Sequence, residues 1–351
     1  MKAQFNKIHL RKPKSCLGWG LLVLGVVVGL FVLLFLAACT VEKIALAQIP
    51  EKYPAPGEMV NVGEYSLHLY CTGDLDAKPV VVVSPGSGSN VAQWPLVQPE
   101  VAKFARICVY DRLGSGWSFG EPQGQTYQEE SKDVHTMLQK AGMEGPYVLV
   151  GHSLGGAVMQ VYAILYPQEV AGMVMVDSRT RGIESKYPPE YLKAIQMTEQ
   201  GSYAFAIPGV FRFLNWFGLY RTQPYFEFLP PELRAVAYGI DYNSRAFTFQ
   251  KSTIGINDER EALFESAGPL PDVPLIVIVH GISENLPGPG VTAEIVQQAD
   301  QVWLDENARL AKDVPQGAYV VAEKSGHNIP MEQPQVVVDA IRTIMEQVRA
   351  R

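Results

Sequence analysis

The segment YVLVGHSLGG, residues 147–156, decides the fold of this chain. Its first four residues are apolar and have the composition of a short strand buried on both faces. Gly151-His152-Ser153-Leu154-Gly155 follows at once, and a helical stretch runs from Ser153 to about Tyr166. A sharp strand-to-helix turn forces its serine into a strained backbone conformation, lifts the hydroxyl above the sheet and needs glycine where side chains would collide. The context therefore predicts that Ser153 is a nucleophile.

Further apolar runs predict the rest of a sheet. An antiparallel pair is expected at 59–62 and 67–71, and buried strands are expected at 80–83, 107–110, 173–176, 275–279 and 318–321. Thr126 and Glu129 form a capping-box pattern before a helix that should end at Lys140, and later helices are expected over 293–311 and 335–348. This alternation predicts a doubly wound, mostly parallel α/β sheet with ligands at the carboxyl ends of its strands.

The first 57 residues differ from the rest of the chain. Residues 1–15 form a basic tail without acidic residues, and the 27 residues from Ser15 to Val41 include no Asp, Glu, Lys or Arg. As a helix this run would be about 40 Å long, against a hydrocarbon core of about 30 Å. We expect a transmembrane anchor over 16–41 and a non-helical linker over 42–57, since the linker contains Pro50, Pro54 and Pro56.

The distribution of charge predicts how the chain is oriented. The net charge is −7, and without the five basic residues of the tail it becomes −12. Basic residues before the span favour a cytoplasmic N-terminus with the body outside. An acidic body without a basic stripe argues against nucleic acid as a partner. A second interpretation is open, because Leu36-Ala37-Ala38-Cys39 resembles a bacterial lipobox in which Cys39 would become the lipidated first residue.

A serine hydroxyl is a poor nucleophile until a base takes its proton, and the chain has six histidines. His327 is the favoured base because it follows the last predicted strand, in a loop that can fold back over the carboxyl edge of the sheet. His280, which ends the strand over 275–279, is the second candidate. The other four lie in the tail, in an early strand, in a helix and beside the serine: His9, His68, His135 and His152.

From about residue 58 to its end the chain resembles the α/β-hydrolase family. Besides the turn at Ser153, it has the block YDRLGSGWS at 110–118 and a late Gly-His-x-x-Pro block at 326–334. The resemblance implies an eight-stranded sheet, the chain order serine, acid, histidine, and a cap domain inserted at about 179–268. Residues 181–264 contain 17 Phe, Tyr or Trp in 84 positions. That composition fits the core of a helical subdomain and also a lid lining an apolar pocket.

The resemblance also implies an oxyanion hole and a third triad member. The loop SPGSGS, residues 84–89, follows the third strand, and we expect the backbone N–H groups of Ser87 and Leu154 to be the donors. The commonest family pattern has an Asp beyond strand seven, whereas this chain reads HGISENL at 280–286. Asp177, at the rigid end of strand six, is the favoured acid. Glu284, beside a Pro/Gly-rich loop, is the alternative.

Two cysteines of the body, Cys71 and Cys108, fall in strands that are neighbours in the implied sheet. An outward location permits a disulfide between them, and buried free thiols are the alternative. No spacing of His, Cys and Asp indicates a metal site, and no Gly-rich turn with a downstream acid indicates a dinucleotide cofactor, so neither is expected.

These features predict a serine hydrolase that cleaves an ester, or less readily an amide, of an apolar acyl or aryl substrate. The serine argues against the related enzymes that open epoxides or displace halide with an Asp nucleophile. A peptidase similar to the proline iminopeptidases stays open, since a substrate amine could bind cap carboxylates from the set Glu184, Glu190, Glu199, Glu227, Glu232 and Asp241. A non-catalytic binding protein on the same fold is the third possibility.

Overall fold

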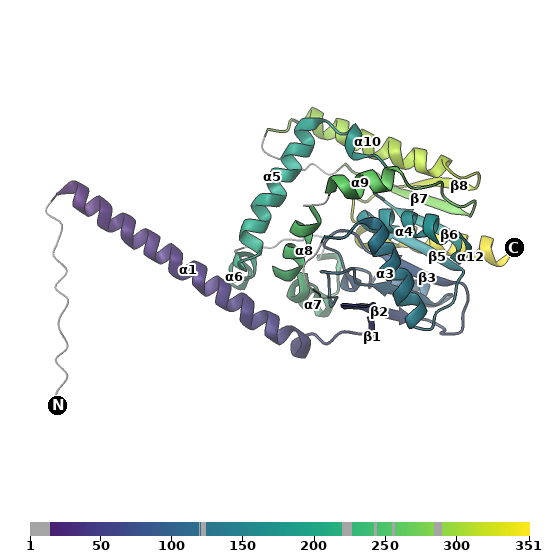
Figure 1. Ribbon diagram of the computed structural model, residues 1–351, viewed down its shortest axis with the longest axis horizontal. Helices are drawn as coiled ribbons and strands as arrows, with labels where there is room; N and C mark the ends of the chain where they lie inside the picture. The colour runs from purple at the N-terminus through teal and green to yellow at the C-terminus, as the bar shows by residue number, and fades with distance from the viewer. Residues whose placement is uncertain are drawn as a thin grey trace.

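The computed structural model describes residues 15–118, 120, 124–219, 227–241, 244–254, 257–283 and 290–351. In this part of the chain an eight-stranded sheet has the order β1-β2-β4-β3-β5-β6-β7-β8 (Figure 1). β2 pairs antiparallel with β1 and β4, and all other pairs are parallel. The predicted mostly parallel α/β sheet is therefore confirmed. The strands are β1 (Glu58–Asn61), β2 (Ser66–Thr72), β3 (Val80–Ser84), β4 (Ile107–Tyr110), β5 (Tyr147–His152), β6 (Val170–Val176), β7 (Leu275–His280) and β8 (Gly317–Ala322).

Helices cover both faces of the sheet because the central strands are apolar on both sides. Successive residues of one strand enter different cores: Val82 packs with α3 (Tyr127–Lys140) and α4 (Leu154–Leu165), whereas Val81 packs with α12 (Pro334–Arg349). The end of α10 (Ala293–Lys312) joins the first core, and the short α2 (Gln98–Val101) and α11 (Ile329–Glu332) join the second. The predicted capping box is present, since Thr126 Oγ1 accepts from the Glu129 N–H and Glu129 accepts from the Thr126 N–H.

A group of helices lies between β6 and β7, in the segment for which the sequence predicted a cap. They are α5 (Pro189–Ala206), α6 (Val210–Trp216), α7 (Pro231–Asp241), α8 (Ser244–Ile254) and α9 (Asn257–Glu265). Figure 1 shows α5, α6, α7 and α8 between the long N-terminal helix and the sheet. Short 3₁₀ turns occur at Val91–Gln93, Pro167–Glu169 and Glu184–Lys186. The helices thus stand apart from the sheet layers, toward the side where α1 leaves the body.

The N-terminal helix is longer than the sequence predicted. α1 covers Cys16–Lys52, and it is long and apolar enough to cross a membrane. The prediction of a non-helical linker from residue 42 is wrong for residues 42–52. Pro50 lies two residues before the end of the helix, and its missing N–H costs only the one helical bond to the Leu46 carbonyl. Packing against the cap holds this part of α1 in helical form, with Ala38, Glu42 and Ile49 buried.

The contact between α1 and the cap centres on the carboxylate of Glu42, which is 3% exposed. One oxygen accepts from Arg212 Nε at 2.6 Å, and the other accepts from the backbone N–H of Ser244 at 2.8 Å. Gly209, with φ +81°, sits where a Cβ would collide with the Glu42 side chain. Two cap helices, α6 and α8, are thereby fixed to the helix that precedes the sheet.

Cys71 and Cys108 form a disulfide between β2 and β4. They are direct partners in the antiparallel register. Of the two alternatives that the sequence left open, a disulfide or two buried free thiols, the structure has the disulfide.

Glu42→Ala should destabilise the full chain by about 2–3 kcal/mol, because the largely buried Arg212 would lose its ion pair with Glu42 and the buried Ser244 N–H would lose its acceptor. Thermal unfolding in detergent measures this loss. Glu51→Ala, at an exposed position of the same helix, is the matched control and should leave the melting temperature within about a degree. Equal melting temperatures for the two variants would contradict a stabilising role for the Glu42 contact.

Candidate active site

The turn between β5 and α4 is strained as the sequence predicted. Ser153 has φ +52° and ψ −123°, a conformation that L-residues rarely adopt. The glycines are needed for space. A Cβ at Gly155 would overlap the carbonyl oxygens of Ser84 and Pro85, and a Cβ at Gly156 would overlap the Ser178 side chain. The turn can therefore form only with these residues, and it presents Ser153 at the carboxyl edge of the sheet.

Three predicted site residues come together at this edge. Ser153 Oγ lies 2.9 Å from His327 Nε2, and His327 Nδ1 lies 2.6 Å from Asp177 Oδ2. They come from β5, from the loop after β8 and from the end of β6. The geometry allows the serine hydroxyl to donate to one ring nitrogen while the other donates to the carboxylate. Glu284, the alternative acid, lies outside the described residues.

The loop that carries His327 is held from two sides. Glu332 accepts from the Gly326 N–H at 2.6 Å and from Ser325 Oγ at 3.0 Å, which explains the acidic position in the late Gly-His-x-x-Pro block. His152 lies 2.9 Å from the carbonyl oxygen of His327 through Nε2. Burial, together with the charge of His327, lowers the pKa of His152 to about 4, so His152 is neutral at pH 7 and donates to that carbonyl. Both contacts fix the ring of His327 over Ser153.

Asp177 is fully buried and also has a positive φ, of +42°. Its N–H donates to the Ile278 carbonyl, and its carboxylate contacts His327 Nδ1, His280 Nδ1 at 2.8 Å and Trp303 Nε1 at 2.9 Å. Burial by itself would raise the pKa of Asp177, but the hydrogen bonds and charges of His280 and His327 outweigh it and hold the pKa well below its usual range. The carboxylate is therefore ionised although it is buried.

His280, the second candidate base, ends β7 as the sequence predicted, but its ring contacts carboxylates instead of Ser153. Its Nδ1 contacts Asp177, and its Nε2 lies 2.9 Å from Asp300 Oδ1 on α10. With both nitrogens facing carboxylates, His280 is arranged as a cation. Sequence reasoning missed Asp300 and Trp303, three residues apart on one helix. The sequence predicted the helix that carries them, but only the fold, in which α10 packs on β7 and β8, brings their side chains to Asp177 and His280.

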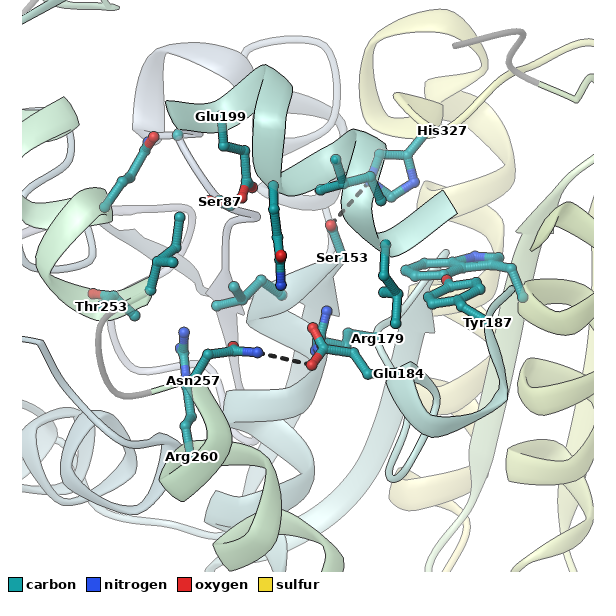
Figure 2. Close-up of a pocket in the computed structure, with 18 of the residues that line it drawn as sticks. Ser87, Ser153, Arg179, Glu184, Tyr187, Glu199, Thr253, Asn257, Arg260 and His327 are labelled. Carbon is teal, nitrogen blue, oxygen red and sulfur yellow. Dashed lines mark hydrogen bonds and ion pairs between the residues drawn. The ribbon is translucent and has the colours of Figure 1, made fainter. Parts of the chain in front are cut away.

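A cavity of about 990 Å³ opens in front of Ser153, between the sheet edge and the cap. Figure 2 shows the Ser153 hydroxyl facing His327, with Asn257 and Arg260 across the cavity on α9. Ser87 and Leu154, the predicted oxyanion donors, both line it beside Ser153. Gly86 packs so closely on Ser153 that an added Cβ would lie 3.0 Å from the serine Cβ. The wall is mixed. Apolar side chains such as Leu113 and Phe249 line it together with polar ones such as Tyr187 and charged ones such as Arg179 and Glu199.

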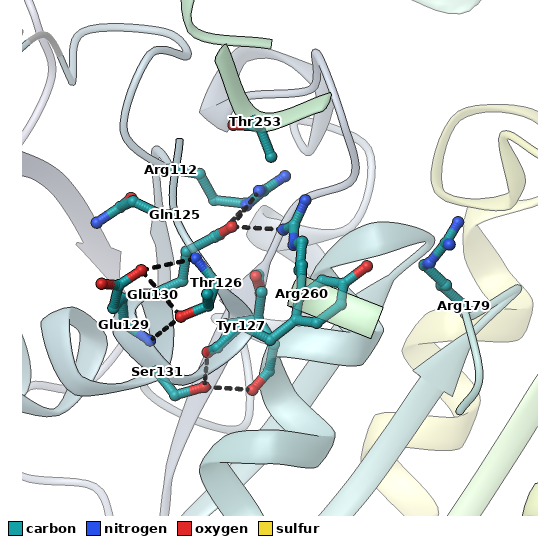
Figure 3. Close-up of polar contacts among 12 residues, drawn as sticks. Arg112, Gln125, Thr126, Tyr127, Glu129, Glu130, Ser131, Arg179, Thr253 and Arg260 are labelled. Carbon is teal, nitrogen blue, oxygen red and sulfur yellow. Dashed lines mark hydrogen bonds and ion pairs between the residues drawn. The ribbon is translucent and has the colours of Figure 1, made fainter. Parts of the chain in front are cut away.

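A buried ionic network ties the cap to the body beside this cavity. Glu130 on α3 lies between Arg112 and Arg260, accepting from them at 2.7 and 2.6 Å (Figure 3). The Arg260 guanidinium also stacks over the Tyr127 ring, 3.8 Å from its centroid. Tyr127 in turn donates to Glu261 of α9. The network holds α9, the last cap helix, against α3.

The YDRLGSGWS block has a structural explanation. The Asp111 carboxylate accepts from the backbone N–H groups of Val91 and Trp117 and contacts His68 Nδ1 at 2.8 Å. Gly116, with φ +52°, leaves room for that carboxylate. The block therefore orders the loops next to the oxyanion segment. In the described ranges no group of three or more His, Cys, Asp or Glu side chains is placed to hold a metal ion.

A family model described as "Alpha/beta hydrolase family" matches residues 80–340, so this chain belongs to the alpha/beta hydrolase family. The chain is 23% identical over 318 residues to the "Probable transporter efuK" of Hormonema carpetanum, a match that covers 84% of this chain and 43% of that protein. The chain thus spans less than half the length of this curated relative.

Solved structures share the fold. The chain is similar to a thermophilic esterase from Thermogutta terrifontis, with a TM-score of 0.58, 21% identity and coverage of 83% of this chain and 98% of the other. It is also similar to the epoxide hydrolase CorEH, with a TM-score of 0.62, 17% identity and the same coverage. At these identities the likeness shows the fold alone, and the reaction has to be argued from the site.

Gly155→Ala should abolish the reactivity of Ser153 and destabilise the body, because the new Cβ would overlap backbone oxygens that cannot move away cheaply. Gly201→Ala is the matched control. Gly201 lies within α5 and a Cβ there meets no atom within 4 Å, so the change should be neutral or stabilise by up to about 1 kcal/mol. Thermal unfolding and labelling of Ser153 by a fluorophosphonate measure both effects. A fully labelled, stable Gly155→Ala protein would contradict the close approach.

Proposed function

We propose that this protein is a membrane-anchored serine hydrolase that cleaves carboxylic esters. The observation that carries the proposal is the continuous chain of contacts from Ser153 Oγ through His327 to the buried Asp177, at 2.9 and 2.6 Å. Ser153 attacks the substrate carbonyl while His327 takes its proton, and Asp177 orients the imidazole and stabilises the imidazolium. His327 then protonates the leaving alkoxide. Water, activated by the same histidine, hydrolyses the acyl-enzyme and restores Ser153.

The oxyanion of the tetrahedral intermediate needs donors beside the attacking oxygen. We assign this role to the backbone N–H groups of Ser87 and Leu154, which belong to the two segments that line the cavity next to Ser153. Leu154 is the first residue of α4, so the positive end of that helix favours the developing negative charge. The closely packed Gly86 keeps the Ser87 segment near Ser153.

The cavity favours an ester with a medium-sized acyl or aryl group. Its volume of about 990 Å³ exceeds what a short acetyl group needs. Leu113, Leu192 and Phe249 supply apolar contacts for the substrate. The alkoxide of an ester is a better leaving group than the nitrogen of an amide, so an ester is the easier substrate. A panel of p-nitrophenyl esters of graded acyl length measures this preference.

The peptidase alternative has one supporting observation. Among the carboxylates considered for binding a substrate amine whose side chains the structure describes, Glu184 and Glu199 line the cavity. Glu184 forms an ion pair with Arg179 and accepts from Asn257, so its charge is already matched. Glu199 is left, and burial raises its pKa. Hydrolysis of proline p-nitroanilide that exceeds hydrolysis of every ester in the panel would favour the peptidase.

Asp177→Asn should nearly abolish turnover, since loss of the triad carboxylate gives the histidine the wrong tautomer and typically costs about 10⁴ in kcat. Glu284→Gln should keep most of the activity. Ester hydrolysis and fluorophosphonate labelling of Ser153 measure both, with Ser153→Ala as the unlabelled control. The reverse pattern would transfer the acid role to Glu284. Absence of labelling in the wild type would refute the serine hydrolase itself.

We further propose that α1 anchors the protein in a membrane, with the N-terminus in the cytoplasm and the body outside. The support is the apolar length of α1 and the basic residues that precede it. The lipoprotein alternative keeps the central contact, because cleavage before Cys39 would retain Glu42 and its bond to Arg212. It would remove the buried Ala38.

Detergent extraction of membranes from expressing cells should yield a protein that retains its Lys-rich N-terminal peptide, as mass spectrometry can determine. An uncleaved helix must stay in the bilayer because its apolar residues would otherwise face water. Cys39→Ser should leave the mass of the mature chain otherwise unchanged. Recovery of a mature N-terminus at a lipidated Cys39 would replace the helical anchor with the lipoprotein.

A further inference from the structure

A second histidine contacts the acid of the proposed triad. The same oxygen of Asp177, Oδ2, lies 2.6 Å from His327 Nδ1 and 2.8 Å from His280 Nδ1. The other nitrogen of His280 reaches Asp300 Oδ1 at 2.9 Å. Five ionisable or reactive groups therefore form one row, in the order Asp300, His280, Asp177, His327 and Ser153.

We propose that His280 is a positioning residue of this site: as a cation between Asp177 and Asp300, it fixes the Asp177 carboxylate and sets how readily His327 accepts a proton. The inference rests on the proposed function, because it concerns the base of that reaction. His280 itself is not a base toward Ser153, since both of its nitrogens contact carboxylates.

The positioning follows from the contacts of Asp177. Besides the two histidines, Oδ1 accepts from Trp303 Nε1 at 2.9 Å and from the His280 backbone N–H at 3.2 Å. His280 thus contacts the carboxylate through both its ring and its backbone. It is the last residue of β7, so its backbone is held by the sheet. With donors on both oxygens, the carboxylate has one orientation toward His327.

The electrostatic role follows from the alternation of charge. A single cation beside Asp177 would weaken the attraction of that carboxylate for the imidazolium that forms on His327 during attack. Asp300 offsets the cation, so the row before attack carries two negative charges and one positive charge. Asp300 is the outer member, with a side chain 21% exposed, and it reaches solvent. The buried Asp177 therefore gains a fixed partner without losing its negative field at His327.

The protonation of His280 agrees with this arrangement. Burial alone would lower the pKa of His280, but the hydrogen bonds and charges of Asp177 and Asp300 outweigh it and raise the pKa to about 9. The groups around the row are Asp177 from β6, Asp300 and Trp303 from α10, and His327 from the loop after β8. The charge of Asp177 also reaches three side chains near the row, those of His152, Tyr187 and Tyr319.

Two substitutions change the charge of the row in opposite directions. His280→Gln removes the cation, so His327 should hold its proton more strongly. The acid limb of the pH profile, in which Ser153 gains reactivity as His327 loses its proton, should then move to higher pH. Asp300→Asn removes the outer anion, so the acid limb should move to lower pH. Each displacement should be about one pH unit, the smallest shift that a charge at close range usually causes in a pKa. If the two residues had a purely structural role, both variants would lower reactivity, and their acid limbs would not move in opposite directions.

The measurement is the rate of Ser153 labelling by a fluorophosphonate between pH 5 and 10 on the full chain in detergent, which needs no knowledge of the natural ester. His135→Gln is the control, because His135 lies on α3 and contacts Glu169, outside the row; its profile should match the wild type. Opposite displacements support the proposal. Displacements in one direction, or none, overturn the role of His280 while leaving the serine hydrolase intact. A wild type that is not labelled at Ser153 overturns both.

Stability gives a second readout. A group whose folded pKa is raised stabilises the protein fully below its unfolded pKa, about 6.5 for His, and that contribution is lost as the pH rises through about 9. The melting temperature of His280→Gln should therefore be lower than that of the wild type at pH 6. The difference between the two melting temperatures should be smaller at pH 10. A gap that stays constant contradicts the protonated state. If His280→Gln does not fold, Asp300→Asn carries the test alone, and an acid limb that is unmoved or raised overturns the proposal.

Discussion

The site depends on one buried anion, the carboxylate of Asp177. An isolated ionised carboxylate away from water costs several kcal/mol, and this one also has a strained φ of +42°. The strain is held by the Asp177 N–H bond to β7, and the charge is offset by donors from β7, α10 and the His327 loop. These elements lie far apart in the sequence. The proposed catalytic histidine is therefore oriented by the same contacts that close the carboxyl edge of the sheet.

The position of the proposed acid is related to the residue that ends β7. In the commonest pattern of the family an Asp follows that strand, whereas here the strand ends in His280 and the anion comes from the neighbouring β6. The two strands are parallel and adjacent in the sheet, so a carboxylate at either end lies near the final loop. With the anion at the end of β6, the end of β7 can hold a histidine instead of an Asp. His280 takes this place and links Asp177 to Asp300.

Local patterns predicted the elements and the two residues with the strongest sequence context. Strand β4 matches its predicted range. Ser153 and His327 were predicted as nucleophile and base from a turn and a loop, and the structure places them in contact. The helix beyond residue 41 could not be predicted, because Pro50 argues against it locally, and only the distant Arg212 and Ser244 show why Glu42 is buried there. Asp300 and Trp303 were missed for the same reason. Their contacts exist only after α10 packs on β7 and β8.

The cap is held by two buried ionic contacts that differ in what they connect. The network of Glu130 with Arg112 and Arg260 fixes α9 to the body, beside the cavity, whereas Glu42 with Arg212 fixes α6 to α1. Buried ion pairs contribute little net stability but strongly specify geometry, since a single unmatched partner is costly. In the proposed anchored state, the helix that leaves the membrane therefore sets the position of the cap directly. In that proposed state the cavity entrance would keep a fixed distance from the bilayer, because a helix packed on the cap would join the cap to the membrane.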